Sequence, residues 1–226
     1  MKMGLLFDLD GTLVDTEANH FAAFVKVLAG FGVGLDLATY AKRVMGFPNA
    51  MIAADFLPHL PPAEGLAALM RKEAAYRDSL GALELAPGAL ALLDFADARG
   101  IACALVTNAP RANAELVLGK LGIAGRFKTL VIADDLARSK PDPLPYLEGL
   151  RRLGVAADAS LAFEDSRSGV RSALAAGIAT VGMMTTLGAA EMLGLGAALA
   201  ARDFSDVRIY GLVAERVGKW EVASGE

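Results

Sequence analysis

The spacing of hydrophobic residues divides the chain into three stretches of different character. Leu5, Leu6 and Phe7 form a short continuous apolar run that is typical of a buried strand, and polar residues end it at once. From residues 17 to 85 the apolar positions recur at spacings of three and four, which indicates amphipathic helices. From residue 86 onward short apolar runs alternate with helical patterns, which favours a parallel sheet covered by helices on both faces. The pattern therefore predicts an α/β fold with a Rossmann-like parallel sheet and an inserted all-helical cap domain.

The same changes of pattern set the expected domain limits. The α/β core should comprise residues 1–16 and 86–226, and the helical cap residues 17–85. No alternating run of β-branched residues occurs within the cap, so we expect it to contain no strand. The chain should cross between the two domains near residues 16–19 and 83–87.

The individual elements are predicted from apolar runs, capping residues, prolines and glycines. Strands after the first are expected at residues 101–106, 130–133, 160–163 and 178–181, with a weak one near Leu199. Cap helices are expected at residues 17–30, 37–44 with Asp36 as the capping residue, 48–57 and 62–76. Core helices are expected at residues 86–99, 110–122, 143–154, 166–176, 191–195 and 206–217.

Two acids follow the first predicted strand directly. Asp8 and Asp10 lie at its carboxyl end, which is where open α/β sheets bind ligands. Because side chains alternate along a strand, residues two apart point the same way, and both carboxylates should reach one crevice. Like charges held this close raise each other's pKa unless a cation lies between them. The simplest interpretation is a hard divalent metal ion, with one acid left to act on a substrate.

Polar residues also end the strand predicted at residues 101–106. Thr107 and Asn108 follow it, and Pro110 opens the next helix. A helix N-terminus has unpaired backbone N–H groups that suit an anion such as phosphate. The two side chains are equally suited to cap that helix, so this stretch alone leaves phosphate binding and capping open.

Two later loops place charged residues after predicted strands. Pro141 and Pro143 stiffen the backbone around Lys140 and prevent a helix there, although a lysine in a loop is usually solvated. Glu164 and Asp165 end the strand predicted at residues 160–163, immediately before a helix. The structural alternative is that Asp165 caps this helix and Glu164 is a charge at the rim.

The composition excludes several classes of protein. The chain has 226 residues, 54% of them hydrophobic, which is enough for one large core with an insertion. Lys and Arg number 22 against 26 Asp and Glu, and with no basic run we expect no nucleic-acid partner. No stretch suits a signal peptide or a membrane span, so we expect the protein in the cytoplasm. The single cysteine, Cys103, lies among apolar residues and should be a buried strand residue, not a nucleophile.

Several segments together resemble the haloacid dehalogenase-like hydrolase superfamily. The segment from Asp8 to Glu17 resembles its first motif in the phosphatase form, Asp-x-Asp-Gly-Thr-Leu-x-Asp-Thr-Glu. Residues 139–143 resemble the third motif, and residues 164–177 resemble the fourth, Glu-Asp-Ser-x-x-Gly-Val-x-Ala-x-x-Ala-Gly. With Thr107 after the second predicted strand, the four motifs occur in order, each at a strand end. The resemblance covers nearly the whole chain, including the helical cap.

The resemblance implies a phosphatase that acts through a covalent intermediate. Asp8 would attack the phosphorus of a phosphate monoester and form an aspartyl phosphate. Asp10 would protonate the departing alkoxide and then deprotonate the attacking water. Lys140, whose peptide bond to Pro141 is expected to be cis, would balance the charge of the nucleophile and the phosphate.

The same resemblance implies the binding residues. The phosphoryl oxygens would be held by Thr107, Asn108 and Lys140. Mg²⁺ would be held by Asp8, the main-chain oxygen of Asp10, and Asp165, with Glu164 at or beside the metal.

Other activities of the superfamily need residues that this chain lacks or places differently. A dehalogenase lacks the second aspartate and the metal acids, and this chain has both. Phosphonate cleavage would need a cap lysine that forms a Schiff base, whereas Lys26, Lys42 and Lys72 look like helix-surface residues. A phosphosugar mutase must hold a second phosphate, usually with an arginine beyond a Gly-containing cap loop. Here that position is Asn49, so Arg43 or Lys72 would have to substitute, and the mutase stays as the alternative function.

A hypothesis from a different class is a non-enzymatic phospho-acceptor domain, which also combines an acid cluster with a threonine and a lysine. Such a receiver needs no helical cap, and its phosphorylated aspartate lies on a middle strand. In this chain the acids follow the first strand, and Asp10 is in place to open a phosphoaspartate. Rapid turnover would favour an enzyme, and slow loss of the phosphoryl group would favour signalling.

Substrate choice is expected to depend on the cap. The candidate contacts are Glu17, His20, Phe47 and Asn49. For His20 an exposed or internally satisfied ring is the commoner outcome. The cap is rich in Ala and Leu, which favours a small or partly apolar leaving group. We therefore expect a small phosphorylated metabolite as the substrate and a monomeric protein without membrane contact, and the sequence leaves the individual ester open.

Overall fold

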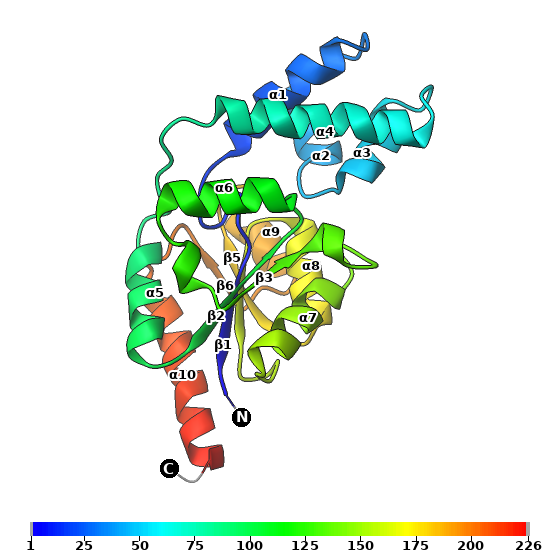
Figure 1. Ribbon diagram of the computed structural model, residues 1–226. Coiled ribbons are helices and arrows are strands. Elements are labelled where there is room, and N and C mark those ends of the chain that lie inside the picture. Colours follow the sequence, from blue (N-terminus) through cyan, green and yellow to red (C-terminus); the bar gives the residue numbers. More distant parts are fainter. Residues whose placement is uncertain (1, 225–226) are drawn as a thin grey trace. The chain divides into compact units, whose positions relative to one another are not determined.

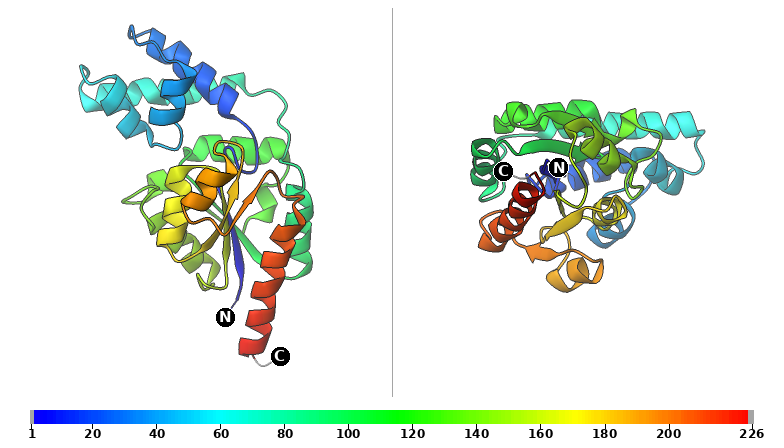
Figure 2. Two further views of the ribbon diagram at one scale, coloured as in Figure 1. Left: turned by 180° about the vertical axis from the view of Figure 1, so that it is seen from behind. Right: turned by 90° about the horizontal axis from the view of Figure 1, so that it is seen from below.

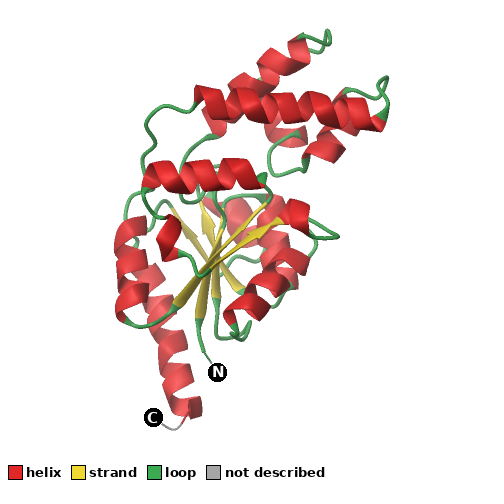
Figure 3. Ribbon diagram, viewed as in Figure 1, coloured by secondary structure: helices red, strands yellow, loops and turns green. Residues whose placement is uncertain are grey.

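The α/β unit is built on a six-stranded parallel sheet. In the computed structural model, which describes residues 2–224, the strand order is β3-β2-β1-β4-β5-β6 and every neighbouring pair is parallel (Figure 3). The strands are β1 (Gly4–Phe7), β2 (Ala102–Thr107), β3 (Thr129–Ile132), β4 (Leu161–Glu164), β5 (Ala179–Met183) and β6 (Leu199–Ala201). The order reverses between β1 and β4, and ligands bind such sheets at the carboxyl ends of the strands on either side of the reversal. The predicted Rossmann-like sheet is confirmed.

Helices cover both faces of this sheet (Figure 1). They are α5 (Ala89–Ala98), α6 (Arg111–Leu121), α7 (Leu144–Leu153), α8 (Arg167–Ala175), α9 (Ala189–Gly194) and α10 (Val207–Ser224). α7 and α8 lie on one face, and α5 and α10 on the other, where the ring centroids of Phe95 and Tyr210 are 5.3 Å apart. Figure 2 shows α8 and α9 side by side, and Val170 and Met192 from these helices share one apolar cluster.

Alternation along β1 sends its side chains to two different cores. Leu6 lies in a buried cluster with Tyr146 of α7 and Ala162 of β4. Phe7 points to the opposite face, where its ring stacks on that of Phe163 with the centroids 4.7 Å apart. Each such side chain contributes roughly 1.5–3 kcal/mol of stability when it is fully buried. β1 is therefore buried on both faces, as its unbroken apolar run predicts.

The register between β1 and β4 brings two acids together. Leu6 pairs with Ala162, and the backbone N–H of Asp8 donates to the carbonyl oxygen of Phe163 at 3.0 Å. Asp8, directly after β1, and Glu164, the last residue of β4, thus each lie two residues beyond that apolar pair. Because side chains two apart share a face, both carboxylates point to the side covered by α7. The pleat of the sheet therefore positions two parts of the site.

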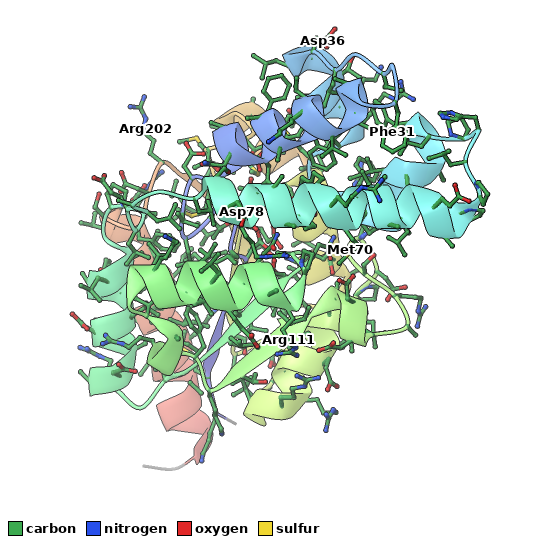
Figure 4. The ribbon with its side chains drawn as sticks, turned by 45° about the horizontal axis from the view of Figure 1, so that its top comes forward. Phe31, Asp36, Met70, Asp78, Arg111 and Arg202 are labelled. Atoms are coloured by element: carbon green, nitrogen blue, oxygen red, sulfur yellow. The ribbon has the colours of Figure 1, made fainter. Side chains whose placement is uncertain are left out.

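The inserted unit consists of helices, and its described elements include no strand. The helices are α1 (Glu17–Ala29), α2 (Leu37–Arg43), α3 (Asn49–Phe56) and α4 (Pro62–Ser79). Phe24 of α1 and Leu69 of α4 belong to its buried core. Asp36 lies at the start of α2 (Figure 4), and its Oδ1 accepts a hydrogen bond from the backbone N–H of Thr39 at 2.7 Å. This is the predicted N-cap, which satisfies one of the N–H groups that a helix start leaves unpaired.

The limits of the two compact units lie close to the expected ones. One unit comprises Met1–Asp15 and Glu84–Glu226, and the other comprises Thr16–Leu83. The limits expected from the sequence lie one residue later at the first crossing and two residues later at the second.

Cys103 of β2 is buried, and burial raises the pKa of its thiol to about 12, so the sulfur stays protonated and unreactive at neutral pH. The structural interpretation of this cysteine is therefore supported. Across the described part of the chain, none of the helices combines the length and the apolar character needed to cross a membrane.

Candidate active site

Lys140 lies at the centre of a buried network beyond the carboxyl ends of three strands. Its Nζ donates to Oδ1 of Asp8 at 2.7 Å, to the carbonyl oxygen of Val106 at 2.7 Å and to Oε1 of Glu164 at 2.5 Å. Burial favours the neutral amine, but the charges of Asp8 and Glu164 outweigh it and raise the pKa of Lys140 above its usual value. The peptide bond between Lys140 and Pro141 is cis, which confirms that expectation. Lys140 is therefore a buried, charged residue and not a solvated loop lysine.

Glu164 is fully buried, and one of its oxygens accepts two hydrogen bonds. The hydroxyl of Tyr146 donates to Oε1 at 2.6 Å, and the same oxygen accepts from Lys140. Burial and the nearby charge of Glu164 raise the pKa of Tyr146 well above its usual value, so the phenol remains a donor. The backbone of α8 also approaches closely, because a Cβ on Gly169 would lie 1.8 Å from Oε2 of Glu164. The position of Glu164 therefore depends on two helices as well as on its own strand.

Replacing Gly169 with Ala is expected to lower the free energy of unfolding by about 1–3 kcal/mol, since the new methyl group overlaps the Glu164 carboxylate. Urea unfolding followed by circular dichroism measures this change. The matched control is Gly119→Ala on the exposed face of α6, where a Cβ has no atom within 4 Å. The free energy of unfolding of that variant should rise by about 0.5–1 kcal/mol, because alanine lowers the backbone entropy of the unfolded chain. Equal stabilities for the two variants would contradict the close approach of α8 to Glu164.

Asp8 is almost completely buried at the end of β1. Burial raises the pKa of Asp8 to about 8, Lys140 acts in the opposite direction, and the charge of Glu164 adds to the rise. The half-buried Asp10 adds a smaller rise, so its carboxylate lies within electrostatic reach of Asp8. A divalent cation among these acids would favour the ionised form of Asp8.

The carboxylates of Asp8, Glu164 and Asp165 form a group that suits a metal ion. One oxygen from each lies within 4.8 Å of the others, and all three side chains are buried. Clustered carboxylate oxygens are the hard donors that Mg²⁺ takes in proteins, so the residues present fit this ion. Gly11 makes room for one of them, because a Cβ there would lie 2.2 Å from Oδ2 of Asp165. Its φ of 76° is also a conformation that favours glycine.

Thr107 and Asn108 brace the loops at the same edge of the sheet. Oγ1 of Thr107 accepts a hydrogen bond from the backbone N–H of Ala109 at 2.9 Å. Oδ1 of Asn108 accepts from the backbone N–H of Lys140 at 3.2 Å, and its Nδ2 donates to the Lys140 carbonyl oxygen at 3.5 Å. These contacts give both side chains a structural role. Their binding of phosphate stays a prediction.

Two of the predicted substrate contacts make polar contacts within the helical unit. Oε2 of Glu17 accepts a hydrogen bond from the hydroxyl of Tyr40 at 2.6 Å. Nδ1 of His20 lies 2.9 Å from Nζ of Lys72, and the His20 ring stacks on that of Tyr76 with the centroids 3.8 Å apart. Both side chains are thus held in defined orientations, and their contact with substrate stays a prediction.

The other two candidates differ in exposure. Phe47 is 39% exposed, whereas Asn49 is half-buried and its Nδ2 donates to Oε1 of Glu73 at 2.8 Å. Nζ of Lys72 donates to the same oxygen at 3.1 Å, and its ammonium lies 3.9 Å from the centroid of the Phe24 ring. Lys72 and Glu73 are each only 2% exposed. The prediction that Lys72 lies on a helix surface was therefore wrong, because α4 buries this residue against α1.

Tyr146 and Thr186 contact acids of the site, and the sequence pattern did not identify them as candidates. Tyr146 was not singled out because its position on α7 fits an ordinary core residue. Thr186 follows β5, and its Oγ1 donates to Oδ2 of Asp165. Each contacts an acid about twenty positions away along the chain, and the local pattern carries no signal for such a contact. For Thr186, its place shortly after a strand end is the one feature that could have drawn attention to it, whereas Tyr146 lies within a helix.

The chain is similar in sequence to known proteins over most of its length. Residues 5–183 match the family described as haloacid dehalogenase-like hydrolase. The chain is 36% identical over 216 residues to phosphoglycolate phosphatase of Rhodospirillum rubrum, a match that covers 92% of this chain and 90% of that protein. It is 32% identical over 206 residues to validoxylamine A 7'-phosphate phosphatase of Streptomyces hygroscopicus subsp. limoneus, covering 90% and 94%.

Solved structures show the same relationship. A hydrolase of family IA, variant 3, from Entamoeba histolytica superimposes with a TM-score of 0.85 at 25% identity, covering 96% of this chain and 99% of that one. A variant of CbbY from Rhodobacter sphaeroides in complex with xylulose-(1,5)bisphosphate superimposes with a TM-score of 0.79 at 27% identity, covering 91% and 96%.

Proposed function

The chain belongs to the haloacid dehalogenase-like hydrolase family, and we propose that it is a Mg²⁺-dependent phosphatase that uses Asp8 as its nucleophile. The observation that carries this proposal is the buried contact of Lys140 with Asp8 and Glu164, next to the carboxylate of Asp165. Positioning and charge neutralisation provide most of the catalysis in phosphoryl transfer. A buried ammonium beside a cluster of carboxylates is suited to both.

The reaction would proceed in two displacements at phosphorus. A carboxylate oxygen of Asp8 attacks the phosphorus while the bond to the ester oxygen breaks, and the carboxyl group of Asp10 gives its proton to the leaving alkoxide. The Asp10 carboxylate then takes a proton from water, whose oxygen attacks the phosphorus. The bond to Asp8 breaks, which returns the carboxylate and releases inorganic phosphate. Asp10 thus serves once as an acid and once as a base.

In both displacements the surrounding groups would offset the negative charge of the phosphoryl group and of the carboxylates. Lys140 would offset the charge of the phosphoryl oxygens, which Thr107 and Asn108 would also contact. Asp8, the main-chain oxygen of Asp10, and Asp165 would hold Mg²⁺, with Glu164 beside it. When bound, Mg²⁺ supplies positive charge that offsets the carboxylates and the transferring group.

The substrate is proposed to be a small phosphorylated metabolite. The named relatives are phosphatases of phosphoglycolate and of validoxylamine A 7'-phosphate, which supports a small phosphate monoester. We assign recognition of the leaving group to the helical unit, Thr16–Leu83, acting as a cap, with Glu17, His20, Phe47 and Asn49 as the candidate contacts.

The alternative of a phosphosugar mutase would need a cation that binds a second phosphate. At Asn49 the side chain is a neutral amide, and it donates to the buried carboxylate of Glu73. Lys72 is paired with the same carboxylate oxygen. A carboxylate in these surroundings opposes a second phosphate, so this arrangement favours the phosphatase.

A panel of phosphate monoesters assayed with Mg²⁺ tests both functions. We expect inorganic phosphate to be released from at least one of phosphoglycolate, sugar phosphates and nucleoside monophosphates, and release should stop when EDTA removes the metal. Phosphorus NMR of the sugar phosphates follows isomers in the same samples. Conversion between isomers without phosphate release would establish the mutase instead, and release that resists EDTA would remove Mg²⁺ from the mechanism.

A further inference from the structure

The loop that follows β5 contacts two other segments of the proposed metal site. The hydroxyl of Thr186 donates to Oδ2 of Asp165, which follows β4. The hydroxyl of Thr185 donates to the carbonyl oxygen of Gly11, in the turn after β1. β5 pairs with β4 in the sheet, so this loop lies at the same edge as the carboxylates. No signal for metal binding drew attention to these two residues in the sequence.

One oxygen of Asp165 accepts a hydrogen bond and lies beside a glycine. Oδ2 accepts the hydrogen bond of Thr186 and lies so close to Gly11 that a Cβ there would be 2.2 Å away. The torsion that orients a carboxylate on its stem is broad, so an aspartate without such contacts takes a range of orientations. A hydrogen bond to one oxygen narrows that range and thereby sets the direction of the other oxygen. Groups that orient metal ligands in this way strengthen metal binding.

We propose that Thr186 is a positioning residue that orients the Asp165 carboxylate for a divalent cation, with Thr185 anchoring its loop to Gly11. This inference rests on the proposed function, because it takes Asp165 as a metal ligand. Thr186 contacts neither the substrate nor the reacting atoms in this proposal. Its effect should therefore appear in metal affinity more than in the chemical step.

The test measures Mn²⁺ binding without substrate, by electron paramagnetic resonance of the free ion during a titration. Thr186→Val keeps the shape of the side chain and removes the hydroxyl, and it should weaken Mn²⁺ binding by about tenfold or more. Thr186→Ser restores the hydroxyl and should bind Mn²⁺ nearly as tightly as the wild-type chain. With substrate present, Thr186→Val should need a higher Mg²⁺ concentration for half-maximal activity and recover most of its kcat at saturating Mg²⁺.

Thr180→Val is the matched control. Thr180 is a buried residue at the other end of β5, and its hydroxyl donates to the carbonyl oxygen of Ile178 at 3.1 Å. This variant should bind Mn²⁺ like the wild-type chain. Wild-type affinity in Thr186→Val, or equal losses in Thr186→Val and Thr180→Val, would overturn the positioning role. A wild-type chain that binds no Mn²⁺ would overturn the metal site itself, and with it the proposed function.

Discussion

Replacing Asp8 with Asn is expected to reduce phosphate release by at least about 10⁴-fold, because the amide cannot attack phosphorus and the covalent route is lost. The fold should survive, since burial already raises the pKa of Asp8 to about 8 and so favours a neutral group at this position. Steady-state release of phosphate from p-nitrophenyl phosphate measures the loss of activity. Thermal unfolding of the same sample checks that the protein is intact.

The control for this variant is Asp158→Asn, which removes a carboxylate from an exposed position before β4. It should keep wild-type activity, so that a loss confined to Asp8→Asn points to chemistry and not to net charge. Rapid quenching of the wild-type reaction with labelled substrate should trap an acid-stable label on the protein, and Asp8→Asn should trap none. Substantial turnover by Asp8→Asn would remove this residue as the nucleophile.

The sheet could be predicted because its strands are buried on both faces. A strand such as β1 then appears as an unbroken apolar run, and Asp8 stands out as the first residue that such a core cannot accept. Boundaries shifted by one or two residues, as at β5, because hydrogen-bonded pairing and not side-chain type decides where a strand stops. The short 3₁₀ helices Ala124–Arg126 and Ala133–Asp135 were not predicted, since three residues are too few to show a period.

In the helical unit, the sequence pattern could not predict that two charged residues are buried. Lys72 and Glu73 are adjacent charged residues on a long helix, which is the usual appearance of a solvated face. They are buried because α4 lies against α1, and the polar partners His20 and Asn49 are more than twenty positions away. A buried ion pair needs such partners, and only the tertiary structure reveals whether they are present.

In the α/β unit, by contrast, Asp8 could be found from a local signal, because a strand end directly precedes it. Two prolines follow Lys140, but a lysine in a loop is usually solvated, so its role was expected only from the resemblance to a known family. Nζ of Lys140 lies 2.7 Å from Oδ1 of Asp8 because the order of strands in the sheet brings the two segments together. This contact could be expected only through the resemblance to a known family.

Replacing Lys140 with Met is expected to affect both activity and stability. Phosphate release should fall by at least about 10³-fold, since the group that offsets the charge of the phosphoryl oxygens is removed. The free energy of unfolding should fall by about 3–5 kcal/mol, because Glu164 is left buried without its cation. Activity assays and urea unfolding of the same preparation measure the two effects.

The double variant Lys140→Met/Glu164→Gln separates these effects. With both charges gone, the buried site no longer contains an uncompensated carboxylate from β4, and Tyr146 can still donate to the new amide oxygen. We therefore expect the double variant to be more stable than Lys140→Met alone while its activity remains as low. A double variant no more stable than the single one would show that Glu164 does not depend on Lys140 for its burial. Recovery of activity in the double variant would show that Lys140 serves the fold and not the phosphoryl transfer, because the amine would then be dispensable once its carboxylate partner is neutral.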